Sequence, residues 1–274
     1  LDYAKIASVL YKENNIKEKI IHNDYSIKKK IPLVAIPTTA GSGAEVTANA
    51  VIYINNIKHS VEHNIFKPNY FFIIPNLIIK ASKKIKASSG FDAISQSIES
   101  IISKKSNQTS LNFAKKSLKI SLKNYLNYLN DPNNNNTFKM AIAANLSGKA
   151  ISISKTNAPH ALSYPFTSIF GISHGHAVSL TLNDFLKFNF FHQNKANCNF
   201  NLSSRYKIIF DLFNVKNIYE LDNKISFIKK KALLENNFSN LGIKIKRDYS
   251  KIIAGVNIQR LSNNPVDLSK KDIK

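Results

Sequence analysis

Three histidines lie close together in the middle of this 274-residue chain. His160 is followed fourteen residues later by His174, and His176 comes two residues after that, in a segment with nearby glycine and proline. Imidazole nitrogens together with a carboxylate suit Fe(II), Zn(II) or Mn(II). A single histidine more often lies in a core or on a surface. A cluster divided by a turn favours a catalytic metal site with positions open for a substrate oxygen.

A carboxylate and an amide have a spacing that suits the same ion. Asp92 and Gln96 are four residues apart, so on a helix they share one face, and Glu99 follows about one turn later. The carboxylate of Asp92 and the amide oxygen of Gln96 could both ligate a divalent cation. The alternative is an acidic residue near a helix N-terminus, where it interacts with the helix dipole.

A turn rich in hydroxyls and glycines directly follows a predicted buried strand. It reads PTTAGSGAEVT, and hydroxyls and successive backbone N–H groups in such a turn can donate to a phosphate that glycine allows to approach. An ordinary tight turn is the alternative. No lysine follows the second glycine, so the turn is not a Walker motif. Its candidate binding residues are Thr38, Thr39, Gly41, Ser42 and Gly43.

The elements that would carry these groups change in type along the chain. Up to residue 80 the pattern predicts a helix over 3–13, a hairpin around Asn55-Asn56, and two short buried strands at 31–36 and 70–74. Beyond residue 81 helical spacing dominates, and the asparagine run at 133–136 predicts a solvated loop. The helices are expected over 88–104, 107–128, 137–154, 159–165, 175–190, 202–214, 223–235 and 248–256.

The composition is strongly basic, with 39 lysine and arginine residues against 17 acidic ones and a formal charge of +22. One interpretation is binding to nucleic acid or to an anionic membrane. We favour a compositional origin, because lysine, asparagine and isoleucine are abundant together and arginine occurs only at positions 205, 247 and 260. The lysines are scattered rather than gathered in a stripe. We therefore expect no specific nucleic-acid partner, although the positive field could attract an anionic substrate.

A single cysteine, Cys198, excludes an internal disulfide and a thiolate zinc cluster. This favours a reducing compartment, and we expect a cytoplasmic protein. No uninterrupted apolar run reaches about 18 residues, so the sequence predicts no membrane-spanning helix and no membrane partner.

Taken in order, the three motifs resemble those of the iron-containing (group III) alcohol dehydrogenases. That family reads P-T-T-[AS]-G-T-G-S-E-V-T at the turn and G-x-D-A-[LI]-x-H-A-[LI]-E on a helix, and its last two histidines have the spacing seen here. The opening Asp2-Tyr3-Ala4-Lys5 resembles the D-x-A-K that follows the family's G-G-G-S phosphate loop. The closing Asn263-Asn264-Pro265 resembles its C-terminal N-N-P. The resemblance covers essentially the whole chain.

The resemblance implies a dehydroquinate synthase-like fold, of α/β plus all-α class. Residues 1–80 would be the remainder of an N-terminal dinucleotide-binding α/β domain, and residues 81–274 an all-helical, metal-binding catalytic domain. Because the chain begins after the position of the glycine phosphate loop, we expect a truncated fragment that lacks the first nucleotide-binding strands. We also expect a homodimer.

Family roles transfer to particular residues. Asp92, His160 and His174 match three metal ligands, and Gln96 stands where the fourth ligand is usually histidine. Glutamine is the weaker ligand, which bears on metal identity and occupancy. Tyr164 stands where many members have a second histidine that helps relay the proton.

The turn residues named above match the turn that holds the dinucleotide, NAD or NADP, and Lys58 stands where the family often has a basic residue near the cofactor. A phosphonoacetaldehyde reductase-like subset resembles the chain more closely, through S-K-T at 154–156 and H-A-L-S-Y-P-F-T at 160–167. In this interpretation Lys155 is a candidate contact for a substrate phosphonate. The alternative is a solvated lysine at a helix end.

These observations predict a metal-dependent, NAD(P)-linked alcohol dehydrogenase or aldehyde reductase. Hydride would pass between the nicotinamide and a small aldehyde, with phosphonoacetaldehyde to 2-hydroxyethylphosphonate as one candidate reaction, and Fe(II) or Zn(II) would polarise the carbonyl. Tyr164 or His176 would pass the proton. The alternatives are a glycerol dehydrogenase-like or other polyol dehydrogenase of the same superfamily, a dehydroquinate synthase, a truncated inactive paralogue, and a basic nucleic-acid-binding protein.

Overall fold

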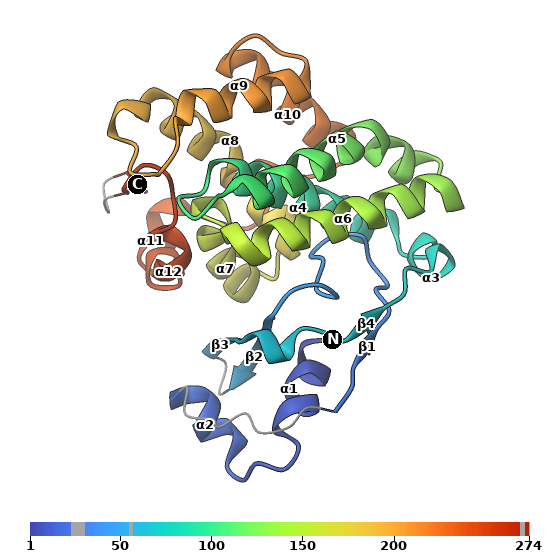
Figure 1. Cartoon of the computed structure of the whole chain (residues 1–274). Coiled ribbons are helices and arrows are strands. Elements are labelled where there is room, and N and C mark those ends of the chain that lie inside the picture. Colours follow the sequence, from blue (N-terminus) through green and yellow to red (C-terminus); the bar gives the residue numbers. More distant parts are fainter. Residues whose placement is uncertain (23–30, 55–56, 269–271, 274) are drawn as a thin grey trace.

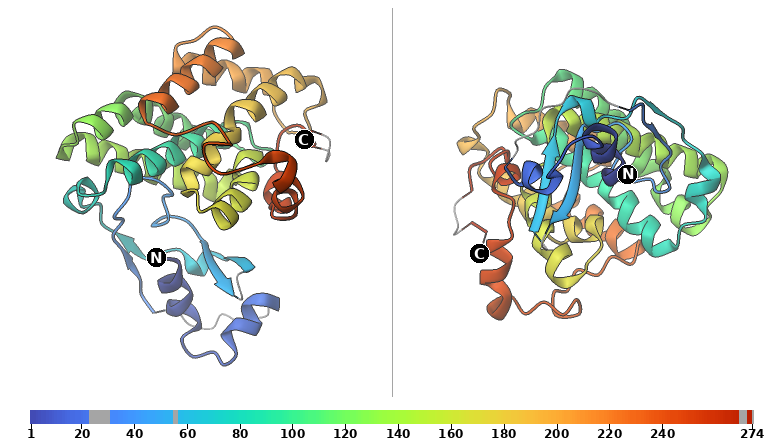
Figure 2. Two further views of the ribbon diagram at one scale, coloured as in Figure 1. Left: turned by 180° about the vertical axis from the view of Figure 1, so that it is seen from behind. Right: turned by 90° about the horizontal axis from the view of Figure 1, so that it is seen from below.

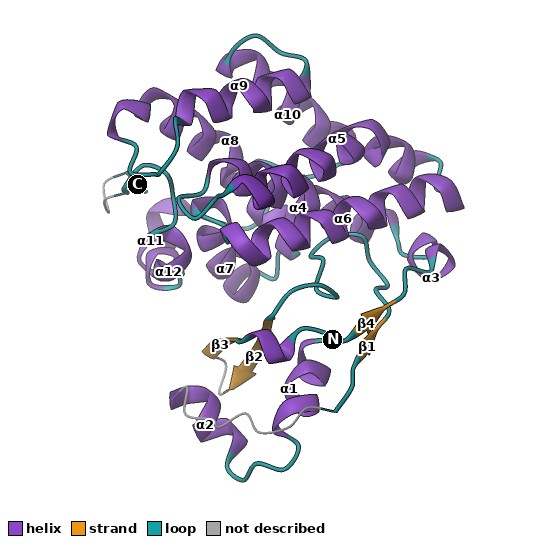
Figure 3. Ribbon diagram, in the orientation of Figure 1, coloured by secondary structure: helices purple, strands orange, loops and turns teal. Residues whose placement is uncertain are grey.

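The computed structural model describes residues 1–22, 31–54, 57–268 and 272–273. A smaller α/β part, which holds the N-terminus, lies to one side of a larger body of helices (Figure 1). The view from behind shows the same division, and in the view from below the α/β part lies in front of the helices (Figure 2). Within the described residues the paired strands lie in the smaller part (Figure 3). No helix in these ranges is long and apolar enough to cross a membrane.

A helix packed on a hairpin forms the N-terminal core. Helix α1 (Asp2–Leu10) buries Ile6 and Val9, as its amphipathic spacing predicts, and these side chains pack with Val61 of the hairpin. Strand β2 (Asn49–Ile54) pairs antiparallel with β3 (Ile57–Glu62), which confirms the predicted hairpin. Its expected turn at Asn55-Asn56 lies outside the described residues.

The two predicted buried strands are shorter than expected and mostly exposed, with Ala35 as the buried residue. Strand β1 (Val34–Ala35) pairs in parallel with β4 (Tyr70–Phe71), with Val34 opposite Tyr70. The side chain of Val34 is 49% exposed and that of Tyr70 is 65% exposed. The prediction of burial was wrong because an apolar run signals burial only where other elements cover the sheet. Among the described residues nothing covers these side chains.

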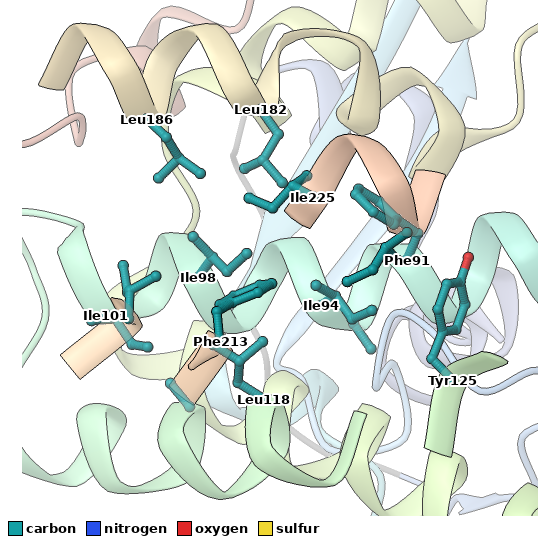
Figure 4. Packing of buried hydrophobic residues seen from close by; sticks show 14 of the residues in the cluster. Phe91, Ile94, Ile98, Ile101, Leu118, Tyr125, Leu182, Leu186, Phe213 and Ile225 are labelled. Atoms are coloured by element: carbon teal, nitrogen blue, oxygen red, sulfur yellow. The ribbon is translucent and has the colours of Figure 1, made fainter. Parts of the chain in front are cut away.

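Helix α4 (Lys83–Ile102) is the centre of the helical body. Sixteen of its twenty residues are buried, as expected of a helix that is surrounded by others. Its neighbours are α5 (Gln108–Asn130), α6 (Asn134–Ser154), α8 (His174–Phe191) and α9 (Leu202–Phe213). Figure 4 shows how Phe91, Ile94, Ile98 and Ile101 of α4 share one apolar cluster with Leu118, Leu182, Leu186 and Phe213 of these neighbours.

The remaining helices cover the ends of this body. All eight helices predicted beyond residue 81 are present, although their ends shift, because caps set the ends and hydrophobic spacing does not show them. Ser82, for example, accepts a hydrogen bond from the N–H of Ile85 and starts α4 earlier than predicted. The other predicted helices are α7 (Ala158–Phe170), α10 (Ile218–Lys231) and α11 (Ile245–Ala254). Short elements that were not predicted are α2 (Ile16–His22), α3 (Pro75–Ile79), α12 (Ile258–Leu261), η1 (Asn64–Phe66) and η2 (Gln193–Lys195).

The asparagine run at 133–136 is a helix start, which corrects the prediction of a solvated loop. The side chain of Asn133 accepts a hydrogen bond from the N–H of Asn136 (3.0 Å), and the side chain of Asn136 accepts one from the N–H of Asn133 (2.9 Å). Asn136 is 7% exposed. The short amide side chains satisfy the first N–H groups of α6 and therefore favour the cap over a loop.

Candidate metal centre and active site

Three helices each contribute one side chain to a metal-ligand cluster. Asp92 comes from α4, His160 from the first turn of α7, and His174 is the first residue of α8. The Oδ1 of Asp92 lies 3.2 Å from the Nε2 of His160 and 3.9 Å from the Nε2 of His174. The three ligand atoms lie within 4.8 Å of one another. Asp92 is the tenth residue of α4, so it is too far from the N-terminus to serve as a dipole-stabilising acid.

A glycine allows the first turn of α8 to touch α4. A Cβ atom placed on Gly175 would lie 2.0 Å from the carbonyl oxygen of Ser88 and 2.8 Å from the Cβ of Asp92. No larger residue fits without moving one of the helices. This close contact explains why His174, directly before the glycine, reaches Asp92.

The cluster leaves two ligand atoms without a hydrogen-bond partner. Among the described residues, the Oδ1 of Asp92 and the Nε2 of His160 are buried and have no hydrogen-bond partner. The two atoms lie close together, but they are not aligned for a hydrogen bond with each other. A buried polar atom without a partner costs about 1–3 kcal/mol. A divalent cation bound to one oxygen and two imidazole nitrogens would satisfy both atoms.

The second ring nitrogen of His160 contacts a buried carboxylate. The Nδ1 of His160 contacts the Oε1 of Glu99, whose Oε2 accepts a hydrogen bond from the N–H of Asn157 (2.7 Å). Burial opposes the charged form of His160, but the Glu99 and Asp92 carboxylates outweigh it and raise the pKa of His160 to about 9. Burial likewise opposes ionisation of Asp92, yet the close contact with His160 and nearby positive charges hold the pKa of Asp92 below its usual value. Carboxylate–histidine pairs of this kind orient metal ligands.

Gln96 lies beside the cluster and has a different set of contacts from those expected of a ligand. Its amide nitrogen donates to the Oδ2 of Asp92 (3.1 Å), and its amide oxygen accepts from the hydroxyl of Ser147 (2.9 Å). One lone pair of the amide oxygen is therefore engaged, and the second stays available to a metal. In this arrangement Gln96 orients Asp92.

A cavity of about 270 Å³ opens beside the two histidines. Tyr164 and Thr167 line it from the same helix face as His160, because their spacing of four and seven residues brings them into register on α7. Arg260 of α12 lines it as well, and the α/β part completes the wall. The hydroxyl of Tyr164 accepts a hydrogen bond from the Nε of Arg260 (2.8 Å).

The turn predicted to hold a dinucleotide borders a second, larger cavity. Thr38, Thr39 and Ser42 are exposed and line a space of about 530 Å³. Gly43 also lines it but packs on α6, with φ at +60° and a Cβ position only 2.5 Å from the carbonyl oxygen of Ala144. Gly41 packs in the same way against Ser89 of α4. Both glycines thus allow the turn to pack closely on the helices, which the sequence did not reveal.

The opening D-x-A-K motif supports both cavities. The buried Nζ of Lys5 donates to the carbonyl oxygen and hydroxyl of Thr47 and to the carbonyl oxygen of Asn49, at 2.9, 3.1 and 2.9 Å. The carboxylate of Asp2 accepts from the N–H of Val51 (3.0 Å) and lines both cavities. The motif therefore connects α1 to the chain between the turn and β2.

Two predicted residues are not brought into the site. The ammonium group of Lys155 contacts the carboxylate of Glu62 and the carbonyl oxygen of Ser152, and Lys155 does not line the cavity beside the histidines. The Nε2 of His176 lies 2.7 Å from the carbonyl oxygen of Glu235, so its ring points to another part of the surface. The side chain of Lys58 lies outside the described part of the chain.

Sequence reasoning missed Arg260 and the role of Glu99. Arg260 is one of only three arginines in a lysine-rich chain and comes just before the N-N-P motif. That rarity was a usable signal. Glu99 could have been found from its position one turn beyond the Asp92–Gln96 face.

Two models of one protein family match this chain. The model described as "Fe-containing alcohol dehydrogenase family, C-terminal" matches residues 86–274, and the model described as "Iron-containing alcohol dehydrogenase" matches residues 1–75. The chain belongs to the iron-containing alcohol dehydrogenase family. The helices that carry Asp92, His160 and His174 all lie in the region matched by the family's C-terminal model.

Two curated members of the iron-containing alcohol dehydrogenase family illustrate the relationship. The phosphonoacetaldehyde reductase of Streptomyces viridochromogenes is 30% identical over 165 residues, which cover 58% of this chain and 41% of that protein. The long-chain-alcohol dehydrogenase 1 of Geobacillus thermodenitrificans is 27% identical over 186 residues, covering 66% and 47%. The chain thus matches less than half the length of either relative.

Solved structures agree with the predicted fold class. The sulfoacetaldehyde reductase from Bifidobacterium kashiwanohense, solved with NAD+, superposes with a TM-score of 0.88 at 26% identity, covering 99% of this chain and 71% of that one. The iron-containing alcohol dehydrogenase from Thermotoga maritima gives 0.81 at 25% identity, covering 99% and 70%. The predicted dehydroquinate synthase-like fold, with an α/β part followed by helices, is confirmed.

Proposed function

We propose that this protein is a metal-dependent, NAD(P)-linked alcohol dehydrogenase that interconverts a small aldehyde and its alcohol. The observation that carries the proposal is the cluster of Asp92, His160 and His174, in which two buried ligand atoms lack partners. The cluster faces a cavity that shares Asp2 and Ser42 with the cavity beside the hydroxyl-rich turn. Residues 1–80 would form the dinucleotide-binding domain and residues 81–274 the catalytic one.

Each residue has a proposed role. Asp92, His160 and His174 would hold Fe(II) or Zn(II), while Glu99 and Gln96 fix the orientation of two of these ligands. When bound, the metal would act as a Lewis acid toward a carbonyl oxygen. The backbone and hydroxyls of the turn, above all Thr38, Thr39, Ser42 and the glycines Gly41 and Gly43, would bind the dinucleotide, with Lys58 as a further candidate.

Tyr164 is the proposed proton relay. It lies in the cavity, one turn beyond His160, and its hydroxyl accepts from Arg260. The hydrogen bond from Arg260 orients this hydroxyl, and a phenol is one of the side chains that can transfer a proton. His176, the other candidate from the sequence, has its ring directed to Glu235 and is not included.

The proposed substrate is a small, anionic aldehyde such as phosphonoacetaldehyde, which would be reduced to 2-hydroxyethylphosphonate. Drug-sized ligands occupy pockets of about 300–1,000 Å³, so a cavity of about 270 Å³ suits a smaller molecule. The relatives named above include reductases of phosphonoacetaldehyde and of sulfoacetaldehyde. A polyol substrate is the second candidate, and activity toward glycerol would favour it. A cytoplasmic homodimer stays a prediction.

Metal binding is the first test of this function. We expect the purified chain to bind about one Fe(II) or Zn(II), measured by elemental analysis after anaerobic reconstitution, and the Asp92→Ala and His160→Ala variants to lose it, since each removes a buried ligand. Asp211→Ala, on the surface of α9, is the matched control and should retain the metal. Full metal content in both ligand variants would contradict the assigned site. Absence of metal in the wild-type chain would favour the inactive-paralogue alternative.

A further inference from the structure

We infer that Arg260 binds the acidic group of the substrate and makes the cavity selective for aldehydes that carry a phosphonate or sulfonate. This inference rests on the proposed function for the aldehyde part of the substrate. The main claim is that Arg260 binds a tetrahedral oxyanion. This claim can be tested without turnover of a substrate.

The first observation is the position of Arg260 in the cavity. Its side chain lines the same cavity as His160 and His174, although it comes from α12, about one hundred residues further along the chain. A ligand in this cavity therefore lies between the metal-ligand cluster and a guanidinium.

The contacts of Arg260 carry the second step. Its Nε donates to the hydroxyl of Tyr164 and its Nη1 to the hydroxyl of Thr156, and both partners are neutral. Within the described residues, no carboxylate lies within 4.0 Å of the guanidinium, whereas the surface residue Arg247 has Asp248 at 2.8 Å. A guanidinium has five N–H donors. The half-buried Arg260 thus has both charge and donors left for an anion.

A second polar atom in the same cavity also lacks a partner. The Oγ1 of Thr167 is buried without a hydrogen-bond partner among the described residues, and Thr167 lines the cavity from α7, one turn beyond Tyr164. A hydroxyl and a planar guanidinium fork together suit the oxygens of a phosphonate or sulfonate. Rotation of the Thr167 side chain toward the cavity would let its hydroxyl and the remaining guanidinium donors of Arg260 bind one ligand.

Arg260 replaces the anion contact expected from the sequence. The ammonium group of Lys155 is paired with Glu62 and does not line the cavity. Arginine also binds an oxyanion in a bidentate way that lysine does not. The selectivity of the cavity is therefore assigned to Arg260.

The test uses methylphosphonate, which has the acidic group but no aldehyde, titrated calorimetrically into the chain. We expect wild-type binding, and a dissociation constant at least about tenfold larger for Arg260→Met, because the variant loses the charge-assisted hydrogen bonds to the anion. Arg247→Met removes the same charge from the surface and should leave binding unchanged. Circular dichroism and zinc binding verify that the Arg260→Met protein is folded, and Arg260→Lys, which keeps the charge, should bind better than Arg260→Met.

Several outcomes would overturn the inference. They are the absence of methylphosphonate binding to the wild-type chain, equal binding by the Arg260→Met variant, and a loss of binding in Lys155→Met instead. Selectivity is then measured with phosphonoacetaldehyde and neutral propanal: Arg260→Met should raise KM for the first more than for the second, so that the ratio of the two kcat/KM values falls. If the wild-type chain reduces neither aldehyde but binds methylphosphonate through Arg260, the proposed function fails while the anion site stands.

Discussion

The residues around the metal ligands hold those ligands in one orientation. One nitrogen of His160 faces Asp92 and the other faces Glu99, so the ring cannot turn without losing a buried partner. Asp92 in turn gives one oxygen to the cluster and the other to Gln96. Orientation of this kind is part of the affinity for a metal.

Replacement of Glu99 tests this orientation. Glu99→Gln keeps the volume but removes the charge that stabilises His160, and we expect zinc affinity to fall by about 10–100-fold, as is typical when an outer partner of a ligand is lost. Competition with a fluorescent chelator measures this constant. Glu18→Gln, on an exposed face of α2, serves as the control. Unchanged affinity in Glu99→Gln would show that the pair has no role in metal binding.

A second buried charge lies between α10 and α8. The ammonium group of Lys229 donates to the carbonyl oxygen of Ser179 (3.0 Å). Burial lowers the pKa of Lys229 to about 8, although the carboxylates of Asp184 and Asp222 partly offset this effect. In an unfolded chain the pKa is about 10.4. Between about pH 8 and 10 the unfolded state therefore binds more protons, and the free energy of unfolding rises with pH.

Lys229→Met should remove this pH dependence. We expect the variant to be more stable at pH 7 by roughly 1–2 kcal/mol, because the desolvation cost of the charge is absent. Its free energy of unfolding should also rise less between about pH 8 and 10. Urea unfolding at several pH values measures both effects, with Lys207→Met on the exposed face of α9 as the control. The same change of stability with pH in the wild type and in Lys229→Met would contradict the assigned pKa.

At the scale of elements, glycines decide how closely the turn and the helices approach. Gly43 of the turn meets Gly148 of α6, and a Cβ on Gly148 would lie 2.7 Å from the carbonyl oxygen of Gly43. Gly175 likewise allows α8 to approach α4 closely, because no Cβ fits there. These contacts set the distances between the turn, the metal ligands and the cavities between them.

Gly148→Ala tests the contact between the turn and α6. The added methyl group should lower the free energy of unfolding by about 1–3 kcal/mol, the usual cost of overpacking. It should also weaken the binding of NADH, because the turn must move away from α6. Urea unfolding and NADH fluorescence are the measurements, and Lys139→Ala on the exposed face of α6 is the control. Wild-type values in both assays would show that the turn adapts without cost.

At the scale of the whole molecule, the candidate site lies where the two parts of the chain meet. The helical part supplies the metal ligands and Arg260, and the α/β part supplies the turn, Asp2 and the hairpin wall. The basic charge is spread over both parts, and the arginine in the cavity is the charge that the geometry assigns to a ligand. Neither part would enclose the cavity alone.

The sequence by itself determined the family, the fold class and the three metal-ligand candidates. These depend on local spacing, such as the fourteen residues between His160 and His174 and the helical periodicity beyond residue 81. Such patterns record which residues share a helix face and which turn types follow a strand. The helices themselves could be predicted for the same reason.

Only the tertiary structure decided which side chains meet. Lys155 and His176 have suitable chemistry and sequence neighbours but point to Glu62 and Glu235. Arg260 joins Tyr164 across 96 residues of chain. Spacing along a chain fixes the direction of a side chain only within its own element. Contacts between elements depend on how closely helices pack, and here that distance is set by positions such as Gly175, where no Cβ fits.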